Sequence, residues 1–491
     1  MSTTQKTALI IIVAYMVLTV FIGLFVSYRK KEKNKARSND DFLMASKSLG
    51  PLVLAATLFA ANTGGASTTG IATNVYSFGL SASWYVIAAG IGFFLVSFIA
   101  PYFRRANAST VPEIVGRRFG KGAHIFTAFT SIAALFMATG AQIIATASII
   151  NVVTGLGFQM AVVITTVIVI IYTMVGGYKS VTAANMMHVL FITLGMTFAM
   201  FVMLGNPLVG GFSGLFEKAA VMTNEQGENM NLLSMVKVGV PTILGYIAMY
   251  FMTFPTGQEI VQTFGSAKDS KSAKLGSIIA GLVSAAYAIV PALIGLMAYV
   301  CIDGYATGPQ KNALADATIT FAPALISGIV LAAIVAATMS SASGNMIGTA
   351  TMFTNDVFRP YINKGKADDN KEVWISRIMM LIVGGVGMIV ALTGNNIIAV
   401  MMGAFTLRSA GPFAAFVCAL FVKNTTKRAA FWSICIGTAV ALVWIYALNT
   451  PWGLSAMVPG GVVAFIAIFI ISHFDIKAGA EPAPLLEFSD N

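Results

Sequence analysis

Charged residues, cysteine and histidine are all scarce in this sequence. Only 10% of its 491 residues are Asp, Glu, Lys or Arg, whereas about 25% is usual in soluble globular proteins, so a water-soluble enzyme is excluded. The three cysteines, Cys301, Cys418 and Cys435, are too few for a disulfide framework and lack the spacing of metal ligands. With only three histidines in addition, we expect no metal centre, and no nucleophile–base pair indicates an enzyme.

Hydrophobic residues, in contrast, make up 57% of the chain, and the mean hydropathy is +0.82. They fall in runs of roughly 20 or more residues, long enough for a helix to cross about 30 Å of hydrocarbon. The runs do not alternate with polar residues as the strands of a membrane barrel would. The sequence therefore predicts an all-α polytopic membrane protein with about 13 transmembrane helices, at residues 8–28, 50–73, 80–101, 123–150, 159–176, 181–205, 237–263, 275–301, 324–352, 373–393, 396–421, 429–449 and 454–472.

The formal net charge of +11 comes from basic residues in the short loops between these runs. In this position they indicate topology rather than nucleic-acid binding. If the N-terminus is outside, 25 of the 30 Lys and Arg lie in cytoplasmic loops or the C-terminal tail; Lys6, Lys218, Lys237 and Lys311 lie outside, and Arg408 lies within a span. Under the positive-inside rule, we expect an external N-terminus and a cytoplasmic C-terminus.

Two of the spans are interrupted by small and polar residues, at 60–70 (AANTGGASTTG) and at 254–257 (FPTG). Irregular backbone at membrane depth is tolerated where protein or a watery cavity satisfies it, and in transporters such broken helices mark the binding site. The spacing of the two breaks favours two inverted repeats of five helices. We expect a first helix and basic cytoplasmic loop at 1–49, a first repeat at 50–205, an external loop at 206–236 and a second repeat at 237–421. Two peripheral helices follow at 422–472, and then a cytoplasmic tail at 473–491 that is disordered from residue 478 on.

Four collinear stretches carry a resemblance to a known family. They are residues 40–51 (DDFLMASKSLGP), 58–62 (LFAAN), 172–178 (YTMVGGY) and 333–343 (AIVAATMSSAS), the last followed by FTND at 353–356. In order and spacing they resemble the sodium:solute symporters, the family of the bacterial proline and galactose carriers and the animal sodium/glucose cotransporters. The resemblance extends over about residues 8–472 and implies a LeuT-like fold of two five-helix inverted repeats.

The resemblance also implies a sodium site. Its ligands would be the backbone carbonyls of Ala60, Thr63 and Ala337 and the hydroxyls of Ser340 and Ser341. Sodium is a hard cation, so oxygen ligands suit it, and an unwound helix frees carbonyls for this purpose. The alternative interpretation is that the serines are small packing residues between helices.

Asn185 departs from the family pattern, because many members have an aspartate there, on the inner part of the ion path. The change removes an anionic relay for the departing ion. Together with the nearby His188, it leaves coupling to protons or another cation as an alternative to sodium.

The substrate cavity is expected beside both broken helices. Positions that bind sugar in the sugar-carrying branch are occupied here by other residues, including Ala66, so a hexose is disfavoured. The candidate substrate-binding residues are Asn62, Gly64, Gly65, Ser67, Tyr250, Tyr287 and Arg408.

Arg408 lies halfway along the span 396–421, whereas no Asp or Glu lies in the middle of any span. A buried guanidinium is costly at this depth and normally faces a cavity and a partner. One hypothesis is that it grips a planar carboxylate of the solute. The alternatives are backbone carbonyls near Pro412, or an ion pair with Glu259 or Asp356, both placed near cytoplasmic helix ends.

We therefore expect a multi-pass transporter of the plasma membrane, in bacteria the inner membrane, that carries a small organic solute with sodium by alternating access. A carboxylate or an amino acid is the favoured solute. The partners are this solute, the sodium ion and the lipid bilayer; we expect no nucleic acid and no cofactor. A channel is disfavoured because the polar breaks cluster at mid-depth, and a transporter-like sensor because it would carry a regulatory domain.

Overall fold

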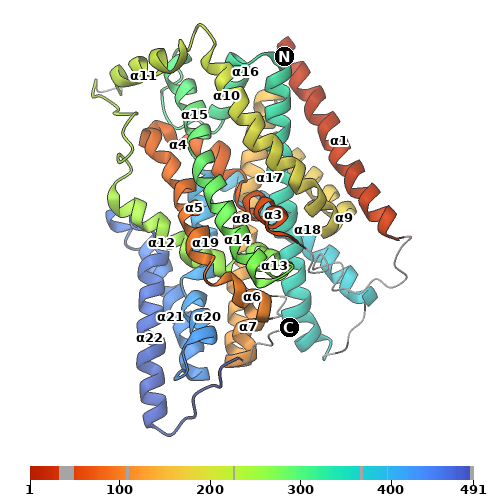
Figure 1. The fold of residues 1–491 in the computed structure, drawn as a ribbon, viewed down its shortest axis with the longest axis vertical. Coiled ribbons are helices and arrows are strands. Elements are labelled where there is room, and N and C mark those ends of the chain that lie inside the picture. Colours follow the sequence, from red (N-terminus) through yellow and green to blue (C-terminus); the bar gives the residue numbers. More distant parts are fainter. Residues whose placement is uncertain are drawn as a thin grey trace.

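The computed structural model describes residues 1–31, 49–106, 110–224, 227–364, 366, 369–394 and 396–486, and this part of the chain is almost entirely helical. The side chains of residues 19–20, 22–31, 175–187 and 369–370 are not among those described. The helices form one elongated bundle, in which the N-terminus lies at the top and the chain ends near the bottom (Figure 1).

The helices follow the apolar runs closely. The first half of the chain forms α1 (Thr3–Lys31), α3 (Pro51–Asn62), η1 (Ala66–Gly70), α4 (Ile71–Phe78), η2 (Gly79–Ser83), α5 (Trp84–Val96), α6 (Ala100–Ala106), α7 (Val111–Phe119), α8 (Lys121–Thr154), α9 (Phe158–Leu190), η3 (Phe191–Gly195), α10 (Met196–Leu204) and α11 (Gly211–Val221). The second half forms α12 (Val240–Thr256), α13 (Gln258–Gly265), α14 (Ser270–Tyr287), α15 (Ile289–Cys301), α16 (Ala313–Phe321), α17 (Ala324–Met352), η4 (Phe353–Ile362), α18 (Asp369–Thr393), α19 (Ile397–Ser409), α20 (Pro412–Phe421), α21 (Lys427–Tyr446), η5 (Pro451–Gly453) and α22 (Met457–Lys477).

The long helices α8 and α17 form the centre of the bundle. They pack against each other, and α17 also contacts α1, α9 and α18. The helices α21 and α22 pair with each other at the lower left of Figure 1. Within the described residues, seven helical runs are long and apolar enough to cross a membrane, or eight with the bent pair α19–α20, and four shorter apolar helices accompany them. The count of 13 therefore stays a prediction.

Both predicted interruptions occur where the sequence places them. The helix α3 ends at Asn62, and the backbone resumes as the π-helical turn η1 at Ala66. The helix α12 ends at Thr256, Gly257 is extended, and α13 follows. A third break separates α19 from α20 by a bend of 44°; Pro412, at the start of α20, cannot donate a helical hydrogen bond there.

Two backbone hydrogen bonds join the two broken helices. The N–H of Leu49, just before α3, donates to the carbonyl of Ser266 at 3.1 Å, and the N–H of Lys268 donates to the carbonyl of Leu49 at 2.9 Å. Ser266 and Lys268 directly follow α13. This two-bond bridge links the beginning of one broken helix to the end of the other.

Several connections differ from the sequence-based expectation. The expected external loop at 206–236 contains the helix α11, and the segment 302–323 contains α16; both lie at the top of Figure 1. Where a short break was expected between the spans 159–176 and 181–205, the backbone of α9 is continuous from Phe158 to Leu190. The turn at 177–180 therefore receives no support from the structure.

The beginning of the C-terminal tail is packed, which corrects the expectation that it is disordered from residue 478. Ala483 is 3% exposed, and its N–H donates to the carbonyl of Thr425 at 2.8 Å. Its own carbonyl accepts from the buried guanidinium of Arg118 at 3.1 Å. Its hydrogen bonds with Thr425 and with Arg118, on α7, therefore hold this part of the tail in place.

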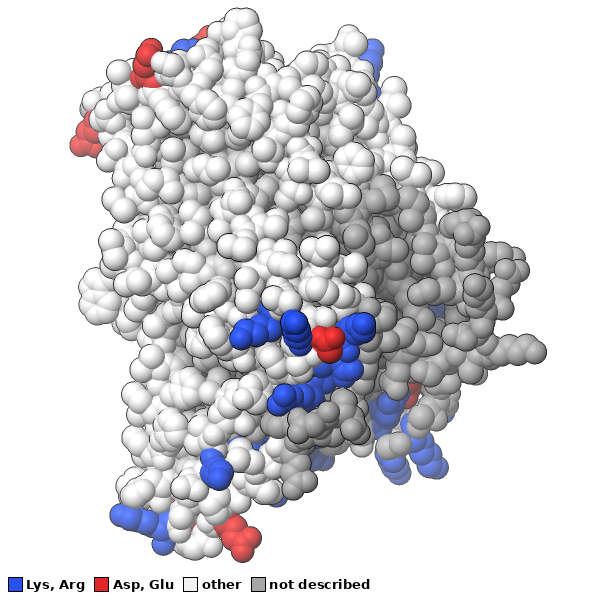
Figure 2. All heavy atoms as spheres, viewed as in Figure 1, with Lys and Arg blue, Asp and Glu red and all other residues white. Residues whose placement is uncertain are grey.

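Basic side chains gather in the lower half of the face drawn in Figure 2. The short helices α6 and α7, which carry Arg104, Arg105, Arg117 and Arg118, lie at this end of the molecule in Figure 1. The distribution agrees with a cytoplasmic lower end, and the orientation in the membrane stays a prediction.

Candidate functional site

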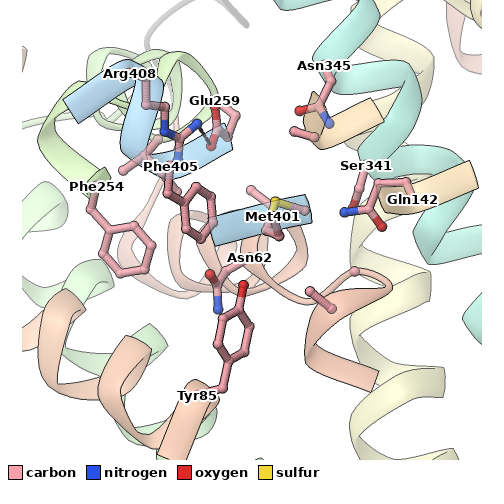
Figure 3. A pocket seen from close by; sticks show the side chains of 15 residues that line it. Asn62, Tyr85, Gln142, Phe254, Glu259, Ser341, Asn345, Met401, Phe405 and Arg408 are labelled. Atoms are coloured by element: carbon pink, nitrogen blue, oxygen red, sulfur yellow. Dashed lines mark hydrogen bonds and ion pairs between the residues drawn. The ribbon is translucent and has the colours of Figure 1, made fainter. Parts of the chain in front are cut away.

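A cavity opens directly beside the break in the first broken helix (Figure 3). Its walls come from α3, η1, α5, α8, α12, α13, α17 and α19, so both broken helices contribute. The lining residues are Ala61, Asn62, Gly64, Ala66, Tyr85, Ala138, Gln142, Phe254, Glu259, Ile260, Ser341, Asn345, Met401, Phe405 and Arg408.

The break itself is held in place by Gln142 on α8. The N–H of Gly65 donates to its Oε1 at 2.7 Å. A Cβ on Gly64 would lie 2.5 Å from the same oxygen, and a Cβ on Gly65 would overlap with Ala145. Gly65 is therefore required for the chain to approach α8 this closely, whereas a Cβ on Gly64 would displace the end of the Gln142 side chain that holds the break.

Side chains after the break satisfy part of its exposed backbone. The hydroxyl of Ser67 donates to the carbonyl of Asn62 at 2.8 Å, and that of Thr68 donates to the carbonyl of Gly64 at 2.9 Å. Ser67 thus contacts the helix break and is not among the residues that line the cavity.

The five candidate sodium ligands lie on two helices that contact each other. Ala60 and Thr63 lie at the end of α3, and Ala337, Ser340 and Ser341 lie on α17. The Oγ1 of Thr63 is buried and has no hydrogen-bond partner among the described residues, while Ser341 reaches the cavity. In the last turn of α3 the carbonyl of Phe59 accepts from the N–H of Thr63, and because the helix ends at Asn62 the later carbonyls, including that of Ala60, are left without regular helical donors. Oxygens of this kind suit sodium, as the resemblance implies.

Arg408 is paired within the protein, which corrects the premise that no carboxylate neutralises it. Its Nη1 donates to the Oε1 of Glu259 at 2.8 Å, and its Nε donates to the Oγ1 of Thr253 at 2.8 Å. The pair joins α19 to α13 at the cavity wall (Figure 3). Glu259 lies at the cavity wall because the helix breaks at Gly257 and α13 begins there, beside the cavity. Among the alternatives weighed for Arg408, the ion pair with Glu259 is the one observed.

The two predicted tyrosines lie behind the wall or away from it. Tyr250 is buried behind Tyr85 and Phe405, with ring centroids 5.5 and 5.8 Å away. Tyr287 donates to the sulfur of Met196 at 3.0 Å and packs on Phe59, and it does not line the cavity. The side chain of Asn185 lies outside the described residues.

Sequence reasoning missed four polar residues of the cavity: Tyr85, Gln142, Glu259 and Asn345. Gln142 is the only amide within the apolar run 123–150, and a polar side chain at mid-span is a signal of function that could have identified it. Glu259 was considered as a partner of Arg408 but was placed near a cytoplasmic helix end, two residues after the predicted break at 254–257.

Solved structures show the same overall arrangement. A sodium-coupled sialic acid symporter in its substrate-bound outward-open state superimposes with a TM-score of 0.79 at 18% identity, covering 98% of this chain and 99% of that chain. Mhp1, a nucleobase-cation-symport-1 family transporter, superimposes with a TM-score of 0.55 at 15% identity, covering 90% of this chain and 95% of that chain. MhsT in complex with L-phenylalanine superimposes with a TM-score of 0.53 at 16% identity, covering 86% of this chain and 98% of that chain. The predicted LeuT-like fold is confirmed.

Sequence comparisons identify relatives of nearly the same length. The chain is 25% identical over 485 residues to the osmoregulated proline transporter of Bacillus subtilis (strain 168), with 93% of each chain covered. It is 25% identical over 495 residues to the sodium/proline symporter of Staphylococcus aureus (strain JH9), with 96% of this chain and 93% of the relative covered. Residues 42–437 match the model of the sodium:solute symporter family, and the chain therefore belongs to this family.

Proposed function

We propose that this transporter couples sodium entry to the uptake of a small amino acid held in the cavity beside the α3 break. The observation that carries the proposal is the position of this break between the candidate sodium ligands and the cavity. Asn62 and Gly64 line the cavity, and the neighbouring Thr63 has a buried hydroxyl without a partner among the described residues. One short segment therefore contacts both proposed ligands.

The charge of the cavity wall supports a zwitterion over a simple anion. Arg408 and Glu259 are the charged residues of the lining, and they neutralise each other. A monoanion would add an uncompensated charge to a low-dielectric site, which is unfavourable. The relatives named above transport proline, a zwitterion, which agrees with this proposal.

The coupling follows from the shared segment. A sodium ion between α3 and α17 would use the carbonyls of Ala60 and Thr63 and the hydroxyls of Ser340 and Ser341, holding the end of α3 against α17. This would fix the backbone of Asn62 and Gly64 at the cavity wall. Solute binding in turn orders the same segment, so each ligand favours the other's site reciprocally.

The test is uptake of labelled L-proline, other amino acids and small carboxylates into proteoliposomes, with a sodium gradient, a proton gradient or neither. We expect a sodium gradient to drive the accumulation of at least one amino acid. Accumulation driven by a proton gradient alone would support the alternative coupling ion and contradict the sodium proposal.

The serine hydroxyls provide a prediction. We expect Ser340→Ala and Ser341→Ala each to raise the sodium concentration for half-maximal uptake about tenfold, because a lost hydroxyl ligand costs roughly 1–1.5 kcal/mol. Solute affinity at saturating sodium should change less. An unchanged sodium dependence in the double variant would show that the site lies elsewhere.

Asn185 provides a second prediction, which derives from the family resemblance. We expect Asn185→Asp to shift the sodium concentration for half-maximal uptake by about threefold or more, since even a solvated carboxylate–cation pair contributes up to about 1 kcal/mol. The external Asn231→Asp is a control for added negative charge. If both variants behave like the wild type, residue 185 is not on the ion path.

A further inference from the structure

Two of the five N–H groups of the Arg408 guanidinium are bound within the protein. Arg408 is 3% exposed; its Nε and Nη1 bind Thr253 and Glu259, both at 2.8 Å. Its Cζ lies 4.8 Å from the centroid of the Phe405 ring. The backbone of Gly257 packs closely against the guanidinium, because a Cβ added to this glycine would lie 2.9 Å from Nη2 of Arg408. Arg408 is thus largely surrounded by side chains and backbone of its own protein, and part of it lines the cavity.

Glu259 is different, because only one of its carboxylate oxygens is engaged. Its Oε1 accepts from Arg408, whereas its Oε2 is buried and has no hydrogen-bond partner among the described residues. The side chain lines the cavity and is 24% exposed. A buried carboxylate oxygen without a donor is costly, and a ligand that supplies a charged donor would remove this cost.

From this asymmetry we infer that the ion pair acts as a receptor for an ammonium group, with Glu259 as the binding residue and Arg408 as the residue that positions it. The inference rests on the proposed function and refines its substrate class. The solute carries an alkylammonium, as amino acids do, and a carboxylate without an amine does not fulfil the requirement. The cavity residue that discriminates between solutes is therefore the acid and not the arginine.

Aromatic rings close to the pair favour the same ligand. Phe254 and Phe405 line the cavity together with Glu259 (Figure 3). Ring faces attract cations, and Phe405 already contacts the guanidinium in this way. An ammonium bound beside Oε2 of Glu259 would therefore be attracted both by the carboxylate and by the ring faces.

The first experiment needs no variant. Purified wild-type protein in lipid nanodiscs is titrated, at saturating sodium, with L-proline and cyclopentanecarboxylate, with L-alanine and propanoate, and with L-phenylalanine and 3-phenylpropanoate. Each pair differs in the amine, and binding is measured by calorimetry. We expect at least one amino acid to bind at least tenfold more tightly than its deaminated partner. If the deaminated acids bind equally well, or if no amino acid binds, the inference is wrong.

The second experiment assigns the discrimination to Glu259. In Glu259→Gln the amide oxygen can still accept from Arg408, while the amide nitrogen replaces Oε2 and repels an ammonium. We expect the preference for the amine to fall to less than threefold. Glu372→Gln is the matched control, because Glu372 also forms a buried ion pair, with Arg359 at 2.6 Å, and does not line the cavity; it should retain the preference.

The outcomes separate the inference from the function on which it rests. If Glu259→Gln keeps the wild-type preference, or changes the sodium dependence instead, Glu259 does not bind the ammonium and the inference fails, while sodium-driven uptake stands. If sodium drives no uptake by the wild type, the proposed function fails. If Glu259→Gln does not fold, the wild-type comparison of amines with deaminated acids still decides the substrate class.

Discussion

Replacing Arg118 by methionine is expected to destabilise the protein by roughly 3–5 kcal/mol, since each hydrogen bond to a charged group contributes about 1.5–3 kcal/mol. The guanidinium donates to four backbone carbonyls, those of Cys418, Val422, Lys423 and Ala483. Methionine fills a similar volume and supplies no donor, so acceptors at the end of α20 lose a partner. The measurement is thermal unfolding of the detergent-solubilised protein, with limited proteolysis of the tail.

The adjacent Arg117 is the matched control. Its side chain is 45% exposed and forms an ion pair with Glu113 one helical turn away, an interaction of about 0.3–0.5 kcal/mol in such positions. Arg117→Met should therefore leave the unfolding temperature almost unchanged. Equal effects of the two substitutions would contradict the role given to the buried guanidinium.

Gly65→Ala is expected to reduce sodium-driven uptake at least tenfold and to destabilise the fold by about 1–3 kcal/mol, the usual cost of overpacking. The new methyl group would overlap with Ala145 on α8. The conflict cannot be relieved without moving the N–H of Gly65 away from Gln142, to which it is bound at 2.7 Å. The cavity wall would move with it.

Gly344 on α17 offers the comparison, because a Cβ there would have no neighbour within 4 Å. We expect Gly344→Ala to fold and transport like the wild type. Uptake and unfolding measured side by side on the two variants test whether close packing at the break, rather than glycine content in general, limits the activity. Normal uptake by Gly65→Ala would show that the break can rearrange freely.

The breaks in the helices could be predicted from the sequence because their cause is local. Glycine and proline disrupt helical hydrogen bonding wherever they occur in a span, and the backbone changes at 63–65 and at Gly257 as expected. The sodium ligands followed from the resemblance of two stretches, 58–62 beside the first break and 333–343, to the family pattern. Their placement on α3 and α17 agrees with that pattern, and the ion-binding role stays a proposal.

The pairing of Arg408 with Glu259 could not be predicted, because it depends on how two distant helices approach each other. The residues are 149 positions apart, and the sequence places Glu259 just after the predicted break at 254–257 without indicating which helix it faces. The packed tail was missed for a similar reason. Residues 478–486 contain one glycine and two prolines and show no helical pattern, and Ala483 is held by a hydrogen bond from the guanidinium of Arg118 on α7. Contacts of this kind have no periodic signature in the sequence.

The two-bond bridge between Leu49 and residues 266–268 has a mechanical consequence. Any movement that separates the start of α3 from the end of α13 must first break both hydrogen bonds. Movements that carry the two segments together leave the bonds intact. The two half-helices should thus move as one unit, bending at Gly257 and at residues 63–65, so that a conformational change of one broken helix is transmitted to the other.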